Sequence, residues 1–123
     1  MDNETSQSLK IAKPLLGKIV EIIVDRPLGS LHPKWKFPYE VNYGYIKGIM
    51  APDGEELDAY VLLVEKPIND FRGKVVAIIH RLNDDDDKLV VIPDGMTITD
   101  EQIDAMTAFM EKWYKHIIVR SED

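Results

Sequence analysis

Acidic side chains gather in two short stretches of the sequence. The first is a Pro-Asp-Gly turn and the residues just after it, which supply Asp53, Glu55, Glu56 and Asp58. The second is the run of four aspartates at 84–87, which ends immediately before Lys88. Carboxylate oxygens are ligands that Mg²⁺ prefers, and protein Mg²⁺ sites commonly combine carboxylates with substrate phosphates. The two stretches therefore indicate divalent-metal chemistry, although an isolated acidic run is more often a solvated hairpin tip.

Asp58 is the most informative of these acids because it lies inside the apolar run 57–64. Strand alternation places Asp58, Tyr60 and Leu62 on one face, and Leu57, Ala59, Val61 and Leu63 on the other. A carboxylate that enters an apolar strand must be paired, hydrogen-bonded or bound to a metal. Glu21 also interrupts an apolar run, but its pattern fits the solvent face of an edge strand better.

Phosphate binding would need cations and hydroxyl groups, and several are present. The candidates are Arg26, Lys34, Lys36, Tyr43, Lys88, Tyr114 and Lys115. Zinc is not indicated, because the chain has no cysteine and its three histidines are scattered. The acidic stretches do not follow the spacing of an EF-hand loop. No glycine-rich phosphate loop or nucleophile elbow occurs.

Composition limits the remaining classes of function. The chain has 123 residues, of which 45% are hydrophobic and 30% charged, as in one ordinary globular domain. Its formal net charge of −7 disfavours binding to nucleic acids or anionic membranes. The longest purely aliphatic run, 75–79, is too short to cross a bilayer. With no signal-peptide pattern at its N-terminus and no cysteine, the sequence predicts a cytoplasmic protein.

Local patterns predict a mainly β protein. Strands are expected at 18–25, 42–50, 57–64, 74–82 and 88–92. A capping box at Thr99 opens a helix whose apolar stripe runs from Ile103 through Trp113 to Ile117. We expect a flexible leader over residues 1–16, followed by a single domain over 17–123. The predicted architecture is a small OB-like five-stranded barrel with one C-terminal amphipathic helix packed on it.

The motifs together resemble the soluble family I inorganic pyrophosphatases, and the chain looks like a short, N-terminally abbreviated member. Residues 53–58, Asp-Gly-Glu-Glu-Leu-Asp, are similar to the family signature D-G-D-P-x-D. Residues 42–45 match its N-Y-G-Y element. Asp84, Asp86 and the segment that begins at Lys88 resemble its second acidic pair and the lysine and strand that follow. Residues 109–115 resemble the helical segment that ends in a Tyr-Lys pair.

The resemblance implies hydrolysis of pyrophosphate to two phosphates with two or more Mg²⁺ ions, or with Mn²⁺. The implied metal ligands are Asp53, Glu55, Asp58, Asp84 and Asp86. The implied catalytic residues are Glu55 as base, Tyr43 and Glu21, and the implied phosphate-binding residues are Lys88, Tyr114, Lys115, Arg26 and Lys34. The implied partner is pyrophosphate alone, without nucleic acid or membrane, and a homo-oligomer is compatible with the pattern.

The sequence departs from the family pattern at three places, one of which is an extra residue between Pro38 and Asn42. Glu55 and Glu56 replace the middle aspartate and the proline of the signature, and the basic segment before Asn42 is short. The alternatives are therefore a hydrolase of another small phosphoanhydride and a non-catalytic OB-like binding module.

Overall fold

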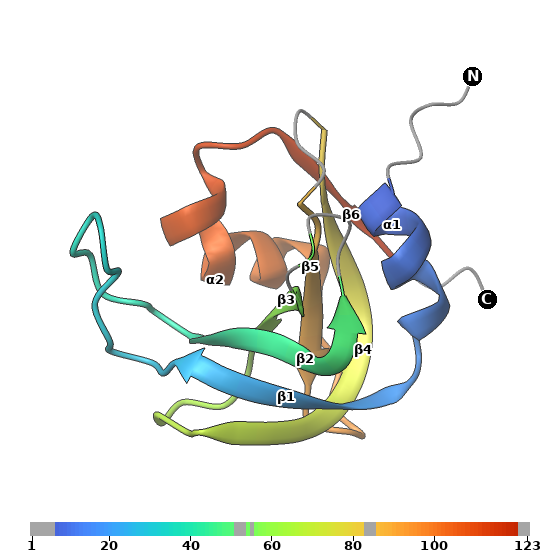
Figure 1. The fold of residues 1–123 in the computed structure, drawn as a ribbon, viewed down its shortest axis with the longest axis horizontal. Helices are drawn as coiled ribbons and strands as arrows, with labels where there is room; N and C mark the ends of the chain where they lie inside the picture. Colours follow the sequence, from blue (N-terminus) through green and yellow to red (C-terminus); the bar gives the residue numbers. More distant parts are fainter. Residues whose placement is uncertain (1–6, 51–53, 55, 83–85, 121–123) are drawn as a thin grey trace.

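The computed structural model describes residues 7–50, 54, 56–82 and 86–120. Within these residues, five strands close into a barrel in the order β1-β2-β3-β5-β4, and β1 pairs again with β4 (Figure 1). Only the β3–β5 pair is parallel in the described barrel. The predicted five-stranded barrel is confirmed. Its strands are β1 (Ile19–Arg26), β2 (Asn42–Met50), β3 (Glu56–Val61), β4 (Asp70–Arg81) and β5 (Lys88–Ile92).

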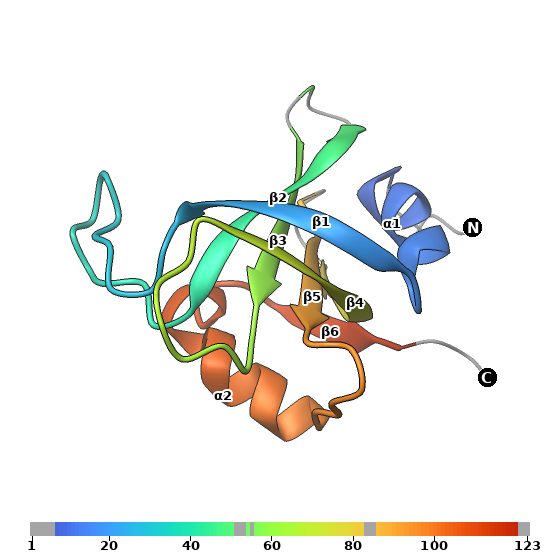
Figure 2. The same cartoon turned by 90° about the horizontal axis from the view of Figure 1, so that it is seen from below.

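The barrel wall separates two apolar clusters. Leu57, Ala59 and Val61 belong to the cluster that fills the barrel. Tyr60 and Leu62 belong to a second cluster, which includes Ile103 and other residues of the helix α2 (Asp100–Glu111). Figure 2 shows α2 lying along one side of the barrel. The alternation expected for this strand therefore places Asp58 on the outer wall, on the face that α2 covers.

The helix begins where the sequence predicts but ends earlier. The Thr99 side chain accepts a hydrogen bond from the Gln102 backbone, and the Gln102 side chain accepts one from the Thr99 backbone, which completes the capping box. The expected stripe through Trp113 and Ile117 is wrong, because α2 ends at Glu111. Ile117 lies instead in β6 (His116–Val119), which pairs antiparallel with the end of β4. The β-branched run of this segment suits a strand better than another helical turn.

The N-terminal segment packs on the barrel. Residues expected within a flexible leader form α1 (Gln7–Ala12) and the 3₁₀ turn η1 (Lys13–Leu15). Leu9 and Ala12 are buried in the cluster that fills the barrel. The apolar spacing of these two residues puts them on one face of a helical turn. In the described residues, no helix is long and apolar enough to cross a membrane.

Gly44 on β2 marks a close backbone approach. A β-carbon at this position would lie 1.8 Å from the Ile23 carbonyl oxygen on the paired strand. We expect Gly44→Ala to destabilise the fold by about 1–3 kcal/mol or more, since the strands would have to separate. Urea unfolding checks this expectation. The matched change Gly17→Ala has open space around it, so its cost should come from its φ of +84° alone.

His116 joins β6 to α2 and makes stability depend on pH. Its Nε2 lies 3.0 Å from Asp104 Oδ1, and its Nδ1 lies 3.1 Å from the Tyr114 carbonyl oxygen. Burial alone would lower the pKa of His116, but these two hydrogen bonds outweigh it and raise the pKa above the usual 6.5. The stabilisation is therefore complete below about pH 6.5 and is lost as pH rises through the higher folded-state pKa.

Urea unfolding of the wild type and of Asp104→Asn measures this contribution. The two proteins should differ more at about pH 6 than at about pH 9, where the histidine is neutral in both states. An equal difference at both pH values would contradict the assignment.

Candidate functional site

Lys88 stands at the centre of an ionic cluster on the outer barrel wall. Its Nζ lies 2.7 Å from Asp58 Oδ2 and 3.1 Å from each carboxylate oxygen of Asp86. The Lys88 side chain is only 4% exposed, whereas Asp58 and Asp86 are 33% and 41% exposed. Parallel pairing of Ala59 with Leu89 places β3 and the start of β5 side by side. Two acids distant in sequence therefore share one buried cation and still face solvent.

Tyr43 lies beneath this cluster. It pairs with Tyr60 across β2 and β3, with ring centroids 5.0 Å apart, and Lys88 Nζ lies 5.7 Å from the Tyr43 ring centroid. Burial raises the pKa of Tyr43 well above its usual value, and the nearby charge of Asp58 and a hydrogen bond to it raise it further. Tyr43 is therefore a neutral hydroxyl that donates to the Asp58 carboxylate, which fixes the orientation of that group.

A second, deeper ion pair supports the first. Arg81 lies at the end of β4, where its guanidinium donates to both carboxylate oxygens of Glu111 at 3.1 and 2.8 Å. The Tyr60 hydroxyl donates to Glu111 at 2.7 Å. Arg81 also lies 3.5 Å from Asp86 and 3.7 Å from the centroid of the Tyr114 ring. Burial alone would lower the pKa of Arg81, but its hydrogen bonds and ion pair with Glu111 raise it, so the guanidinium remains charged.

Asp87 anchors the end of the acidic run. Its buried carboxylate lies 3.1 Å from His80 Nδ1 and accepts a hydrogen bond from the Arg81 backbone. Its backbone N–H donates to the hydroxyl of Ser8 on α1 at 3.3 Å. Burial raises the pKa of Asp87, and the contact with His80 opposes that rise. The two described aspartates of the run are thus bonded on the barrel rather than fully solvated, which favours a site over a plain hairpin tip.

Sequence reasoning missed three residues in or near the ionic cluster: Asp25, Glu111 and Arg81. Asp25, at the end of β1, has a pKa raised mainly by burial and also by the negative charges of Asp58 and Glu56, so it lies near the cluster. The sequence pattern that could have indicated Asp25 is an acid at the end of an apolar strand. Glu111 is four and eight residues beyond Thr107 and Ile103, which are both buried, so it is an acid on the apolar side of a helix. The signal of Arg81 is a cation at the end of a buried strand, just before the acidic run.

The structure brings some of the expected phosphate ligands toward the cluster. Tyr114 reaches it through its contact with Arg81. Arg26 hydrogen-bonds the hydroxyl of Tyr39, and the Tyr39 ring lies 5.6 Å from that of Tyr43. Lys115 is exposed and lines a shallow hollow beside Tyr114.

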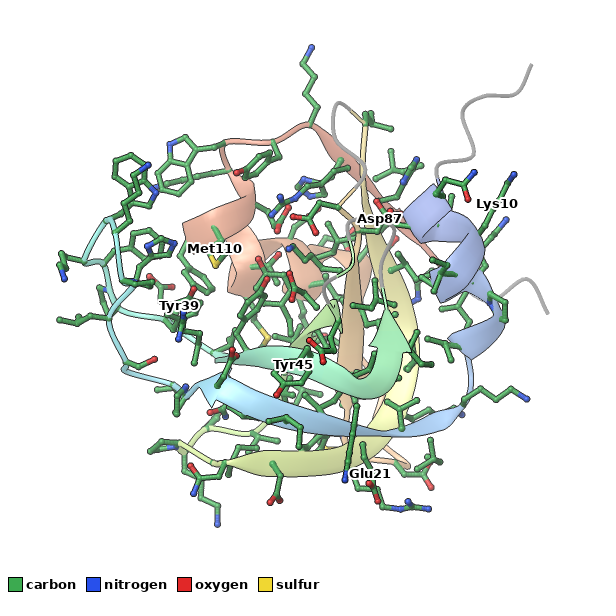
Figure 3. All side chains as sticks on the ribbon, viewed as in Figure 1. Lys10, Glu21, Tyr39, Tyr45, Asp87 and Met110 are labelled. Atoms are coloured by element: carbon green, nitrogen blue, oxygen red, sulfur yellow. The ribbon has the colours of Figure 1, made fainter. Side chains whose placement is uncertain are left out.

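Other expected residues lie elsewhere or outside the described chain. Glu21 is 61% exposed and lies 3.6 Å from Arg72, and Figure 3 shows it at the edge of the molecule, away from Asp87. Lys34 is exposed and sits over the ring of Trp35, 4.8 Å from its centroid. The expected ligands Asp53, Glu55 and Asp84 lie outside the described residues.

The described donors fit a hard cation. Asp58 and Asp86 present partly exposed carboxylate oxygens to one point, the ligand type that Mg²⁺ takes. Over 7–50, 54, 56–82 and 86–120, no group of three or more histidines and acids gathers closely enough to hold a metal. Mg²⁺ usually completes its coordination with water and substrate phosphate, so two carboxylates suit it without a full protein cage.

The fold is that of inorganic pyrophosphatases. The enzyme from Ehrlichia chaffeensis superposes with a TM-score of 0.63 at 16% identity, covering 82% of this chain and 84% of that chain. The Helicobacter pylori enzyme superposes with a TM-score of 0.63 at 14% identity, covering 90% of this chain and 88% of that chain. The Coxiella burnetii enzyme superposes with a TM-score of 0.59 at 19% identity, covering 85% of this chain and 86% of that chain.

The family follows from the sequence. A family model described as inorganic pyrophosphatase matches residues 9–119. The chain belongs to the inorganic pyrophosphatase family, whose members are hydrolases acting on pyrophosphate. No curated protein sequence matches it.

Proposed function

We propose that this protein hydrolyses inorganic pyrophosphate to two phosphates in a Mg²⁺-dependent reaction. One observation carries the proposal: on a pyrophosphatase-family barrel, Lys88 is buried between two solvent-facing carboxylates, Asp58 and Asp86. A dianionic site with a cation at its base can take divalent metal and phosphate together. Family membership supports pyrophosphate as the substrate.

Mg²⁺ would be held by Asp58 and Asp86, together with Asp53, Glu55 and Asp84. When bound, Mg²⁺ supplies positive charge that polarises phosphoryl oxygens and lowers the pKa of water. Two or more ions of Mg²⁺, or of Mn²⁺, are compatible with this set of five carboxylates. Asp25 adds negative charge close to Asp58.

Each side chain at the site would then have a separate role in the reaction. Glu55 accepts the proton of the attacking water, and Tyr43 holds the Asp58 carboxylate in place through its neutral hydroxyl. Lys88, buried between Asp58 and Asp86, would place its ammonium group to neutralise a phosphate bound at the same site. Arg26, Tyr114 and Lys115 would serve as further phosphate ligands. Fixed charges of this kind supply most of the rate enhancement in phosphoryl transfer.

We assign no direct role to two residues that the family resemblance implies. The described contacts of Glu21 and Lys34 are with Arg72 and Trp35 rather than with the cluster. A cytoplasmic location and the absence of nucleic-acid and membrane binding complete the proposal, the last because the net charge is −7. A homo-oligomer is compatible with it.

Phosphate release from pyrophosphate by the pure protein tests the proposal. We expect hydrolysis with Mg²⁺ and none after chelation, with activity restored when Mg²⁺ is added back. A protein that leaves pyrophosphate intact at every Mg²⁺ and Mn²⁺ concentration would instead be a binding module or a hydrolase of another phosphoanhydride.

A further inference from the structure

An aromatic pocket lies beside the ionic cluster and is not explained by pyrophosphate. Its volume is about 610 Å³, within the range of small-molecule sites. In the described part of the chain, its aromatic lining residues are Trp35, Phe37, Phe109, Trp113 and Tyr114. Pyrophosphate has no apolar surface that such walls would bury. The pocket therefore indicates a ligand with a flat organic group.

The two tryptophans of the sequence both line this pocket, and both are unusually exposed. Trp35 is 64% and Trp113 is 62% accessible to solvent. They come from different segments, the loop between β1 and β2 and the junction between α2 and β6. Exposed aromatic side chains that gather around a hollow mark a binding surface. Aromatic faces of this kind stack on nucleobases without strong sequence preference.

The loop that carries Trp35 is held by hydrogen bonds within the loop. The His32 Nδ1 atom accepts hydrogen bonds from the backbone N–H groups of Lys34 and Trp35, both at 3.1 Å. The His32 backbone donates to Phe37 at 2.8 Å, and Leu31 pairs with Pro38 as an isolated antiparallel bridge. These contacts constrain the backbone on either side of Trp35, whose side chain lines the pocket, and a constrained loop lowers the entropy cost of binding a ligand.

Two of the segments that line the pocket are basic, although the chain as a whole is acidic. The formal net charge of the protein is −7. Segments 31–38 and 112–116 nevertheless each contain two lysines and no acid. Lys112 lines the pocket and lies 4.8 Å from the Trp113 ring centroid. The acid in the lining is Glu40, which can accept a hydrogen bond from an amino group of a base. The surroundings thus suit an anion that carries a base.

A short chain of side-chain contacts links the pocket to the ionic cluster. Tyr114 lines the pocket and stacks on Arg81, which lies 3.5 Å from Asp86, and Asp86 contacts Lys88. We propose that the pocket binds the base of a nucleoside diphosphate whose diphosphate group reaches the Lys88 cluster. This inference rests on the proposed function, because it takes the cluster to be a diphosphate site.

Hydrolysis of such a substrate follows the same chemistry. The oxygen of water bonds to the terminal phosphorus, and the bond from that phosphorus to the bridging oxygen breaks. The bridging oxygen stays on the nucleoside monophosphate, inorganic phosphate is released, and the proton from water passes to solvent. No other reactant is needed.

Calorimetric titration of the full-length protein with Mg²⁺ tests the inference. The two probes are α,β-methylene ADP and methylenediphosphonate, which share a non-hydrolysable head group and differ in the nucleoside. We expect the nucleotide to bind at least about tenfold more tightly, and to quench tryptophan emission, since both tryptophans line the pocket. Equal affinities for the two probes would overturn the inference.

Substitutions of Trp35 test whether the preference for the nucleotide arises in this pocket. Trp35→Ala should raise the Kd of the nucleotide at least about tenfold while leaving that of methylenediphosphonate unchanged. Trp35→Phe should restore most of the affinity, because it keeps a stacking ring. Met96→Ala removes an exposed apolar side chain outside the pocket lining and should behave as wild type. Should Trp35→Ala instead dissociate an oligomer and leave nucleotide affinity intact, the pocket is a subunit interface and the inference fails.

The two proposals fail in different ways. Hydrolysis of pyrophosphate without preference for the nucleotide probe would remove the nucleotide inference alone. Base-dependent binding of the nucleotide by a protein that leaves pyrophosphate intact would remove the proposed substrate and retain the pocket assignment.

Discussion

Asp58→Asn is expected to lower kcat for pyrophosphate hydrolysis by about 100-fold or more. The amide is nearly the same size as the carboxylate but is neutral, so it is a much weaker ligand for Mg²⁺. It also removes the negative charge that lies 2.7 Å from Lys88 Nζ. Because Asp58 is 33% exposed, the fold should tolerate the change. Steady-state phosphate release, measured over a range of Mg²⁺ concentrations, gives both kcat and the metal requirement.

Asp94→Asn is the matched control, since Asp94 lies exposed in a turn beyond β5. It should keep wild-type activity and metal dependence. Wild-type kcat in Asp58→Asn would show that the cluster is not the reaction site, even if the protein hydrolyses pyrophosphate. An unchanged Mg²⁺ requirement with a low kcat would separate Asp58 from metal binding.

Glu111→Ala is expected to destabilise the protein by about 3–5 kcal/mol, a large part of the stability of a typical domain. Glu111 is 1% and Arg81 4% exposed, so the change leaves a guanidinium largely without its counter-ion inside the protein. It also removes the acceptor of the Tyr60 hydroxyl. Urea unfolding measures the loss, and near-ultraviolet circular dichroism checks that the native packing persists.

Two comparisons separate the ion pair from the loss of side-chain volume. The double variant Arg81→Leu with Glu111→Leu removes both charges and should be less destabilised than Glu111→Ala. Glu101→Ala removes an exposed acid from the first turn of the same helix and should cost about 0.3–1 kcal/mol. A loss below about 1 kcal/mol for Glu111→Ala would mean that Asp86 or water already compensates Arg81.

Much of the barrel was predictable because its strands carry local signals. β2 and β5 have the expected bounds, and the alternation of 57–62 correctly separates the barrel interior from the outer wall. The capping box at Thr99 is likewise a local hydrogen-bonding pattern. The end of α2 was not predicted, because the apolar spacing continues past Glu111 and only the open edge of β4 selects a strand for 116–119.

The sequence by itself determined that acids flank two buried strands, that Asp58 needs a partner, and that the chain resembles a pyrophosphatase. These conclusions depend on residue types and short-range periodicity, which a linear chain displays directly. Only the tertiary structure decided which cation meets Asp58, since β3 and β5 become neighbours through closure of the barrel. The same closure brings Arg81 to Glu111, 30 residues away, and leaves Glu21 facing Arg72. Long-range pairing of this kind depends on packing across the barrel, which no local pattern records.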